Sequence, residues 1–151
     1  MTRPRKKRSV QRPPLFSSFK PTGTGDIRLR SLELTLDEFE AIRLADEMGL
    51  DHAESATRMN ISRSTFSRLV SKARHKVARF LIEGRHLQIE GGDVHFRGNL
   101  VRCRACGQLY QAALDENLSR CPACGSPDIV DLAGRFGHGR CCHRHHHGQR
   151  R

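Results

Sequence analysis

Four of the six cysteines in this 151-residue chain occur as two Cys-x-x-Cys pairs. The first pair lies in "CRACG" (residues 103–107) and the second in "CPACG" (residues 121–125), and fourteen residues separate the two inner cysteines. Two thiolates at this spacing can hold one ion, and the glycine after each pair lets the chain turn away. The predicted metal ligands are Cys103, Cys106, Cys121 and Cys124.

The predicted cofactor is one structural Zn²⁺ ion. Four thiolates suit both zinc and iron, and the pairs also resemble those of rubredoxin-type iron centres, which leaves iron as the less favoured alternative. Disulfides are disfavoured because we expect a cytosolic protein, whose thiols are kept reduced. A redox-active dithiol is disfavoured because such a pair usually stands alone at the start of a helix.

The segment around these cysteines is short and has few large apolar side chains, so it needs the metal to fold. We expect residues 93–134 to form a zinc ribbon. Its β-hairpin would carry "QLYQAAL" (residues 108–114) after the first pair and "DIVDLAG" (residues 128–134) after the second. This ribbon is similar to the zinc domains of nickel-hydrogenase maturation factors.

Residues 135–151 contain a second group of metal-binding residue types. Imidazoles and thiols together bind nickel, copper or zinc, which makes metal sensing or delivery one interpretation. The interpretation that we favour is a flexible tail that binds metal only adventitiously. The residues concerned are Cys141, Cys142, His143, His145, His146 and His147.

Positive charge is concentrated in two segments that flank an acidic one. The chain has 27 lysines and arginines against 16 acids, a net charge of +11. Residues 1–30 hold nine basic residues and one acid, residues 31–60 hold two and eight, and residues 61–90 hold seven and two. This distribution favours a surface that faces a polyanion, with general solubility as the alternative. The run "RPRKKR" (residues 3–8) would either follow DNA phosphates or extend as a solvated arm.

Capping patterns predict two helices between residues 35 and 60. Thr35 and Glu38 form a capping box at the start of the first helix, and Gly49 suits its end. Asp51 caps a second, shorter helix, which ends at Asn60. Asn60 can take the left-handed conformation that a tight turn requires.

A long basic helix follows this turn, an arrangement typical of a helix-turn-helix. Ala56 is small where two helices must approach closely, and Ser62 can cap the long helix. With about 100° of rotation per residue, the apolar residues of the long helix fall on one face. That predicted packing face consists of Phe66, Leu69, Val70, Ala73, Val77, Phe80 and Leu81.

The opposite face of the long helix is polar, and residues 61–82 contain no acid. Short hydroxyls let a helix approach the base edges of DNA, and an arginine can offer two hydrogen bonds to a guanine. The solvated face of a small helical bundle would explain the cations but not the missing acids. The residues predicted to face bases are Ser64, Ser67, Arg68 and Lys72, and those predicted to cap the helix or contact phosphates are Ser62, Arg63, Thr65 and Arg74.

Five linked motifs resemble a known bacterial and archaeal family. They are "RPRKKR" (3–8), "FKPTG" (19–23), "LTLDEFEAIRLAD" (34–46), "ISRSTFSRLVSKARHKVA" (61–78) and "LIEGRHLQIEGG" (81–92). The family is known as domain of unknown function 134. The resemblance implies a DNA-binding protein without catalytic activity, whose helix-turn-helix is similar to region four of bacterial sigma factors. Asn60 replaces the more usual glycine of the turn, and Asp51-His52 replaces a Ser-Gln pair.

Two classes of protein are not expected. No run of about 18 apolar residues could span a membrane, and the N-terminus lacks the apolar core of a signal peptide, so we expect a cytoplasmic protein. An enzyme is not expected because no phosphate-cradling glycine loop is present and an all-cysteine metal site has no open position for water.

Together these patterns predict a mainly α protein with a helix-turn-helix domain of three to four helices, a small β zinc ribbon and disordered termini. The predicted divisions are a basic arm at 1–30, the DNA-binding domain at 31–92, the ribbon at 93–134 and the tail at 135–151. The predicted function is that of a transcriptional regulator that binds double-stranded DNA sequence-specifically. A homodimer and a protein partner of the ribbon stay open. The alternative is a metal-handling or protein/RNA-binding adaptor that uses the ribbon and the tail.

Overall fold

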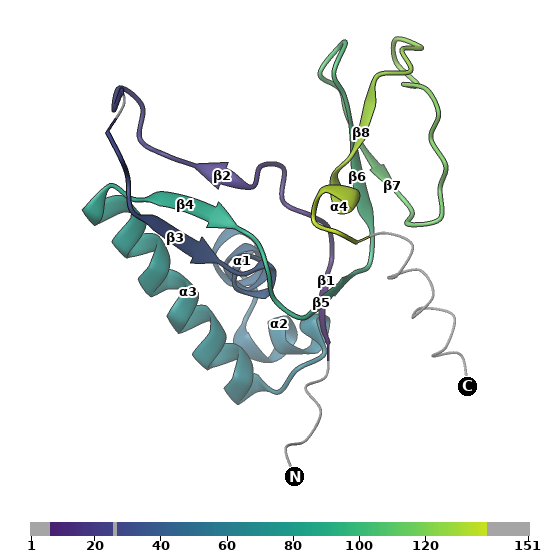
Figure 1. Cartoon of the computed structure of the whole chain (residues 1–151). Helices are drawn as coiled ribbons and strands as arrows, with labels where there is room; N and C mark the ends of the chain where they lie inside the picture. Colours follow the sequence, from purple (N-terminus) through teal and green to yellow (C-terminus); the bar gives the residue numbers. More distant parts are fainter. Residues whose placement is uncertain (1–6, 26, 139–151) are drawn as a thin grey trace. The chain divides into compact units, whose positions relative to one another are not determined.

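The computed structural model describes residues 7–25 and 27–138, and Figure 1 labels its helices and strands. The chain divides into two compact units. Unit 1 comprises residues 1–9 and 16–94, and unit 2 comprises residues 10–15 and 95–151. In these described ranges, no helix is both long and apolar enough to cross a membrane.

Unit 1 is built around a run of helices: α1 (Leu36–Ile42), its π-helical continuation η1 (Arg43–Glu47), α2 (His52–Met59) and α3 (Arg63–Glu83). Each helix starts where the capping residues predict. The Thr35 N–H donates to Glu38 Oε2 at 3.0 Å, and the Asp51 side chain accepts from the Glu54 N–H at 2.8 Å. These contacts satisfy backbone and side-chain groups at the helix starts, so local sequence is enough to place them.

The turn between α2 and α3 has the predicted left-handed residue. Asn60 adopts φ 59° and ψ 43°, and the Ile61 N–H donates to the Ala56 carbonyl at 3.0 Å. This six-to-one hydrogen bond closes the end of α2 and redirects the chain at once into α3. The hydroxyl of Ser62 then accepts from the Thr65 N–H at 3.2 Å and caps α3.

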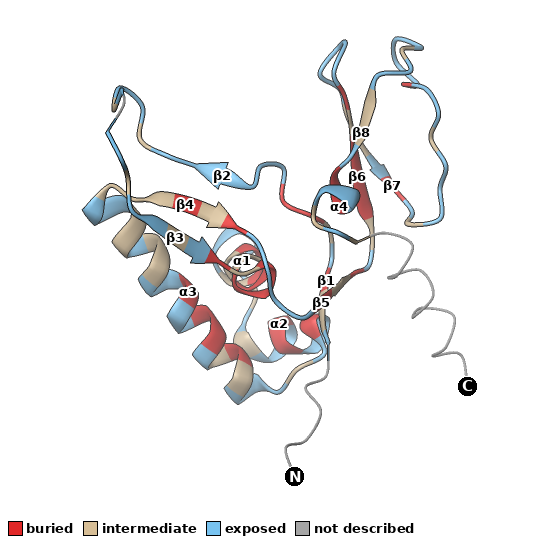
Figure 2. Ribbon diagram, viewed as in Figure 1, coloured by how far each residue is buried: buried red, intermediate tan, exposed pale blue. Residues whose placement is uncertain are grey.

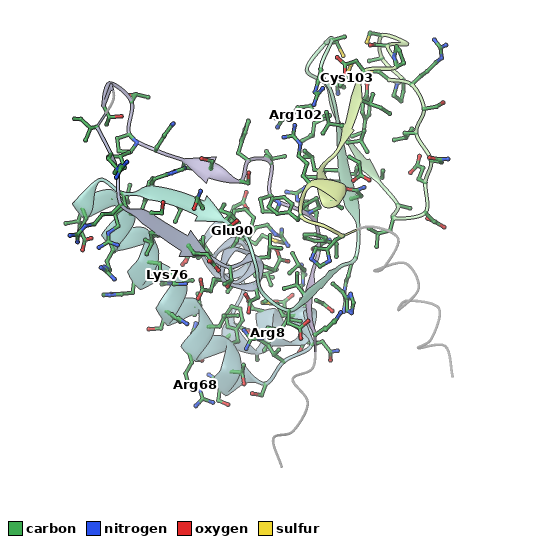
Figure 3. The ribbon with its side chains drawn as sticks, viewed as in Figure 1. Arg8, Arg68, Lys76, Glu90, Arg102 and Cys103 are labelled. Carbon is green, nitrogen blue, oxygen red and sulfur yellow. The ribbon has the colours of Figure 1, made fainter. Side chains whose placement is uncertain are left out.

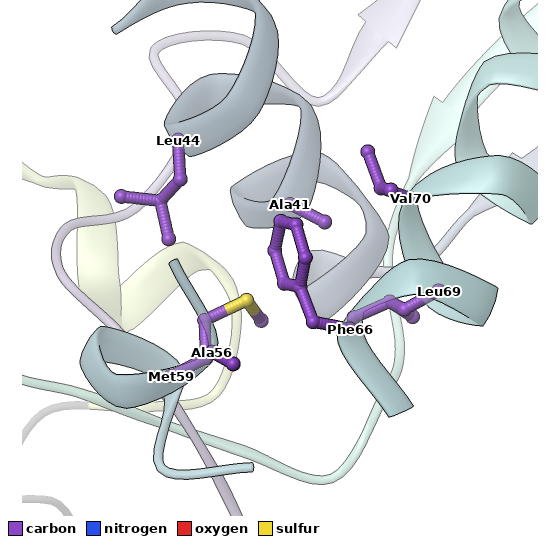
Figure 4. Packing of buried hydrophobic residues seen from close by; sticks show 7 residues of the cluster. All are labelled: Ala41, Leu44, Ala56, Met59, Phe66, Leu69 and Val70. Carbon is purple, nitrogen blue, oxygen red and sulfur yellow. The ribbon is translucent and has the colours of Figure 1, made fainter. Parts of the chain in front are cut away.

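One apolar cluster holds the three helices together (Figure 4). The ring of Phe66 on α3 is fully buried between α1 and α2, and the small side chain of Ala56 allows the close approach of α2. This packing fixes the start of α3 on two sides. The buried members are Ala41, Leu44, Ala56, Met59, Phe66, Leu69 and Val70.

The prediction that Leu81 belongs to the packing face of α3 is wrong. Leu81 is 70% exposed, and its neighbour Ile82 is 85% exposed. The helical wheel places Leu81 on the correct side, but the end of α3 extends beyond the cluster that would cover it.

Substitution of Asn60 tests the strain at this turn. We expect Asn60→Ala to lower the free energy of unfolding by about 1 kcal/mol, because alanine is disfavoured in the left-handed region. Asn60→Gly should be close to neutral, since glycine adopts positive φ freely. Urea unfolding, followed by the helical circular-dichroism signal, measures both, with exposed Ser71→Ala on α3 as control. An unchanged midpoint for Asn60→Ala would contradict the expected strain.

Unit 1 also contains short strands, one of which, β2 (Ser18–Phe19), lies within the arm predicted for residues 1–30. β2 and β3 (Ser31–Leu34) flank β4 (His86–Ile89) in a three-stranded sheet. β4 is antiparallel to β2 and parallel to β3. The side chains of Leu34, Leu87 and Ile89 are buried (Figure 2). A further two-stranded sheet pairs β1 (Arg8–Val10) with β5 (Val94–Phe96).

The predicted mainly α class is therefore wrong. Helices account for 34% of the structure and strands for 21%, in three small sheets, so the fold is mixed α/β. The prolines and glycines of residues 7–30 exclude a long helix, as expected, but they do not exclude short strands. Pairing partners such as Ser18 and Gln88 lie far apart in the sequence, and no local pattern announces them.

Unit 2 is a three-stranded sheet followed by one turn of helix. Its elements are β6 (Asn99–Cys103), β7 (Leu109–Ala112), β8 (Ile129–Asp131) and α4 (Leu132–Arg135). The sheet order is β7-β6-β8, with both outer strands antiparallel to β6. The prediction of a β-hairpin formed by residues 108–114 and 128–134 is wrong. In the sheet, β6, which leads into the first cysteine pair, lies between these two segments.

Candidate metal centre and nucleic-acid interface

The four predicted cysteine ligands come together in unit 2. Their sulfur atoms all lie within 4.8 Å of one another. The Sγ atoms of Cys103 and Cys124 are 3.6 Å apart, and those of Cys106 and Cys121 are 3.7 Å apart. A tetrahedral zinc ion with Zn–S bonds of about 2.3 Å requires sulfurs about 3.8 Å apart. The cluster thus has the size of a tetrathiolate metal site (Figure 3 labels Cys103).

The two cysteine pairs have the same backbone structure. In the first, the Gly107 N–H donates to the Cys103 carbonyl at 3.0 Å, and in the second the Gly125 N–H donates to the Cys121 carbonyl at 2.8 Å. Both glycines have positive φ, 77° and 73°, which other residues rarely adopt. Each turn therefore presents one buried and one exposed sulfur to the centre of the cluster.

Tyr110 on β7 is a polar neighbour that the sequence did not reveal. Its hydroxyl lies 3.0 Å from Cys121 Sγ and accepts a hydrogen bond from the Ala123 N–H at 3.1 Å. The hydrogen bond with Tyr110 lowers the pKa of the Cys121 thiol to about 6, and partial burial together with this bond raises the pKa of Tyr110 to about 12. Tyr110 therefore stabilises a thiolate at Cys121.

The remaining thiols oppose ionisation of the whole cluster. Although the Ser126 N–H lowers the pKa of Cys124, partial burial and hydrogen bonds with the neighbouring thiols raise it to about 12. Sulfurs this close cannot all carry negative charge without a cation between them. The chemistry of the cluster therefore fits a bound divalent cation, which would make all four thiolates compatible.

The predicted DNA-binding residues lie along α3, and the structure separates them by the contacts that they make. Ser62 caps the helix, and its hydroxyl is 2.8 Å from that of Thr65 and 3.2 Å from that of Ser64. These three hydroxyls form a small exposed network at the start of α3. Arg63 and Arg68 are exposed on the same helix (Figure 3 labels Arg68).

Acidic residues neutralise several of the other α3 cations. Arg74 makes two hydrogen bonds to the Asp46 carboxylate, at 3.0 and 2.8 Å. Lys76 Nζ lies 2.8 Å from Glu38, which is only 2% exposed, and Lys72 Nζ lies 3.8 Å from the same carboxylate. Phosphate contact by Arg74 would therefore compete with this ion pair. Lys72 is 69% exposed and keeps access to solvent.

Arg63 and Arg68 differ from these cations. Across residues 7–25 and 27–138, neither guanidinium has an ion-pair or hydrogen-bond partner. Both lie in the first turns of α3, where a recognition helix would contact base edges. The structure thus leaves two uncompensated positive charges at this end of the helix.

A groove of about 810 Å³ runs along the start of α3 within unit 1. Its lining includes the cations Arg68, Lys72 and Arg8, the last of which the sequence placed in a basic arm. The acids Asp37, Glu38 and Asp93 line it as well. Arg8 forms an ion pair with Asp37 at the start of α1. Nothing in the sequence pairs these two residues, which are 29 positions apart.

Gly92 lies in the lining of this groove, where the backbone approaches Asp37 closely. A side chain there would place its first carbon 2.9 Å from Asp37 Oδ1, and the backbone has φ +94°. Both the close approach and the positive φ favour glycine at this position. Gly92 therefore lets the chain after β4 lie directly against the start of α1.

Comparison with known families identifies the chain. The model of the family described as "Protein of unknown function DUF134" matches residues 1–97, which is more than half of the sequence. The chain belongs to this family. This match to the DUF134 model confirms the resemblance that the five sequence motifs indicated. No solved structure gave a significant match.

Relatives of this DUF134 protein match well beyond the family model. A UPF0251 protein of Chloroherpeton thalassium is 46% identical over 132 residues, which is 87% of each chain. A UPF0251 protein of Moorella thermoacetica is 42% identical over 96% of this chain and 95% of the relative. One from Caldicellulosiruptor bescii is 39% identical over 98% of this chain and 99% of the relative. The similarity therefore extends through unit 2 as well as unit 1.

Proposed function

We propose that this protein binds double-stranded DNA sequence-specifically, as a non-enzymatic transcriptional regulator of the cytosol, and reads the major groove with the first turns of α3. The observation that carries the proposal is the pair of exposed arginines, Arg63 and Arg68, which have no acidic partner in the described part of the chain. An α-helix is about 10–12 Å wide with its side chains, which matches a major groove of about 12 Å.

The distribution of ion pairs supports this assignment. Lys76 pairs with the buried Glu38 and Arg74 pairs with Asp46, so the acids facing α3 act on its middle and not on its first turn. A polyanion approaching the first two turns would therefore meet Arg63 and Arg68 without breaking an ion pair of either residue. The cap at Ser62 and the buried ring of Phe66 hold this turn rigidly, which lowers the entropy cost of binding.

We propose that the cysteine cluster holds one structural zinc ion. The spacing of the four cysteine sulfurs supports a closed tetrahedral site. Zinc also suits a structural role because it has no redox chemistry. When bound, the ion crosslinks the turns that follow β6 and precede β8. Unit 2 would then serve as a stable platform for a protein partner or a second copy.

The adaptor alternative uses the zinc ribbon together with the tail, whose metal-binding residue types are the cysteines and histidines at 141–147. These residues lie outside the described part of the chain. No described contact favours metal delivery, so the DNA-binding proposal rests on unit 1.

A binding selection tests the proposed function. Purified full-length protein is mixed with a random pool of DNA duplexes at near-physiological salt, and the retained DNA is sequenced. We expect a shared sequence motif whose recovery is lost with Arg68→Ala. Retention without a motif, weakening steeply with salt, would show only a general electrostatic attraction and would reject sequence-specific reading.

Substitution of Tyr110 tests the neighbour of the metal centre. We expect Tyr110→Phe to weaken metal affinity about 10–100-fold, because the Cys121 thiolate loses the hydroxyl that stabilises it. Competition with a chelating indicator dye measures the affinity. Leu109→Met on the same strand is the matched control, since this half-buried apolar side chain cannot donate a hydrogen bond to a sulfur. Equal affinities for Tyr110→Phe and the wild type would remove the hydroxyl from the metal site.

A further inference from the structure

We propose that Ser67 does not read a base but positions His52, and that His52 contacts a DNA phosphate through its Nε2 atom. This inference rests on the proposed DNA-binding function and changes the roles assigned within it. It moves one predicted base contact from α3 to a phosphate contact at the start of α2.

The first observation is a hydrogen bond between the two helices. Ser67 Oγ lies 2.8 Å from His52 Nδ1, although the residues are 15 positions apart. Ser67 is half-buried, whereas Ser64 and Ser71 on the same helix are exposed. The hydroxyl of Ser67 is therefore engaged by α2 and is not simply presented to solvent.

The second observation is that the core holds the His52 ring from another side. The rings of His52 and Phe66 meet edge to face, with centroids 5.3 Å apart and an interplanar angle of 67°. Phe66 is fully buried and cannot shift without disturbing the helical cluster. The orientation of the imidazole is thus set by Phe66 on one side and by Ser67 at Nδ1.

The chemistry of the pair determines what the other nitrogen can do. In the proposed tautomer, the Ser67 hydroxyl donates to Nδ1, which leaves the imidazole proton on Nε2. In the part of the chain that the structure describes, Nε2 has no hydrogen-bond partner, and it is not among the buried polar atoms without a partner. An accessible N–H with a fixed direction is a suitable donor to a phosphate oxygen.

This arrangement also limits what Ser67 can offer to DNA. A serine hydroxyl has a single proton to donate, and in the proposed tautomer that proton goes to Nδ1. Direct base reading then falls to exposed side chains in the first turns of α3, above all Arg68 and Ser64. Ser67 becomes a positioning residue that acts through His52.

A double-mutant cycle tests the proposal. The variants are Ser67→Ala, His52→Phe and the double variant, with Ser67→Thr as the conservative replacement that keeps the hydroxyl. His52→Phe preserves a ring against Phe66 but removes both nitrogens. Dissociation constants of the full-length proteins are measured by fluorescence anisotropy on the selected duplex and on one with a scrambled core.

We expect Ser67→Ala to weaken binding to both duplexes by the same factor, about tenfold. Ser67→Thr should restore binding, and Ser67→Ala should have no further effect when His52 is already Phe. Unfolding midpoints measured alongside should stay close to that of the wild type. If Ser67 had a purely structural role, Ser67→Ala would instead change the unfolding midpoint. Such a role would not explain a coupling between Ser67 and His52 in DNA affinity.

Three results would overturn the inference: a loss confined to the selected duplex, losses that multiply in the double variant, or no loss with Ser67→Ala. A wild-type protein that binds neither duplex would instead reject the proposed function itself. A wild type that binds, combined with uncoupled variants, would reject only the roles of Ser67 and His52.

Discussion

We expect Cys121→Ser to prevent binding of the proposed metal ion and to abolish the ordered structure of β6, β7 and β8. Cys121 is a buried candidate ligand, and its sulfur is the one that Tyr110 contacts. Structural zinc contributes an apparent binding free energy of about 10–16 kcal/mol, far more than so small a sheet can obtain from its own core. Loss of one thiolate therefore outweighs any other single change in unit 2.

Elemental analysis after dialysis against a chelator measures the bound metal, and amide NMR spectra report the order of the sheet. The matched control is Cys142→Ser, which alters a tail cysteine outside the described residues. A Cys121→Ser protein that keeps a tightly bound ion and its sheet signals would reject the site. Iron in place of zinc in the wild type would reject the identity of the metal but not its ligands.

Arg68→Ala should weaken binding to the selected DNA by about 1–3 kcal/mol and relax the preference at one base pair. Arg68 is exposed in the first turns of α3 and has no partner among the described residues, so its guanidinium is available to both acceptors of a guanine. The capped, packed start of the helix fixes the backbone from which this side chain extends. Arg63 shares both features, an exposed position near the start of α3 and the lack of an acidic partner in the described part of the chain. The other lysines and arginines of α3 form ion pairs.

Competition binding against duplexes that differ at single positions measures the effect. Arg79→Ala is the matched control, because Arg79 lies near the other end of α3 and pairs with Glu83 at 3.2 Å. We expect that variant to bind nearly as the wild type does. An equal loss for Arg68→Ala on every duplex would assign Arg68 to a phosphate and would leave base reading to other residues.

The clustered cysteines could be predicted because their spacing is local. Within each pair the two sulfurs are joined by a single turn, whose geometry follows from four or five consecutive residues. Tyr110 could not be predicted in the same way. It reaches Cys121 because β7 pairs with β6 in a register that sets Tyr110 opposite Val101, and that register is a property of the folded sheet.

The candidate DNA-binding face shows the same limit. The wheel pattern of α3 identified the polar face and its cations, but not which cations are compensated. Lys76 meets Glu38 across 38 positions, and Arg74 meets Asp46 across 28. Only the packing of α3 on α1 and η1 brings these acids to the middle of the helix and leaves Arg63 and Arg68 without them.

The sequence by itself determined the helix starts, the left-handed turn at Asn60 and the two cysteine pairs, because each depends on hydrogen bonds and backbone preferences within a few residues. The tertiary structure alone decided the mixed α/β class, the strands of residues 8–34 and the partner of Ser67. Strand β3 pairs with β4 only after three helices have intervened, and Ser67 meets His52 only when α2 packs on α3. Such contacts depend on which distant segments the core brings together, and no local pattern encodes that choice.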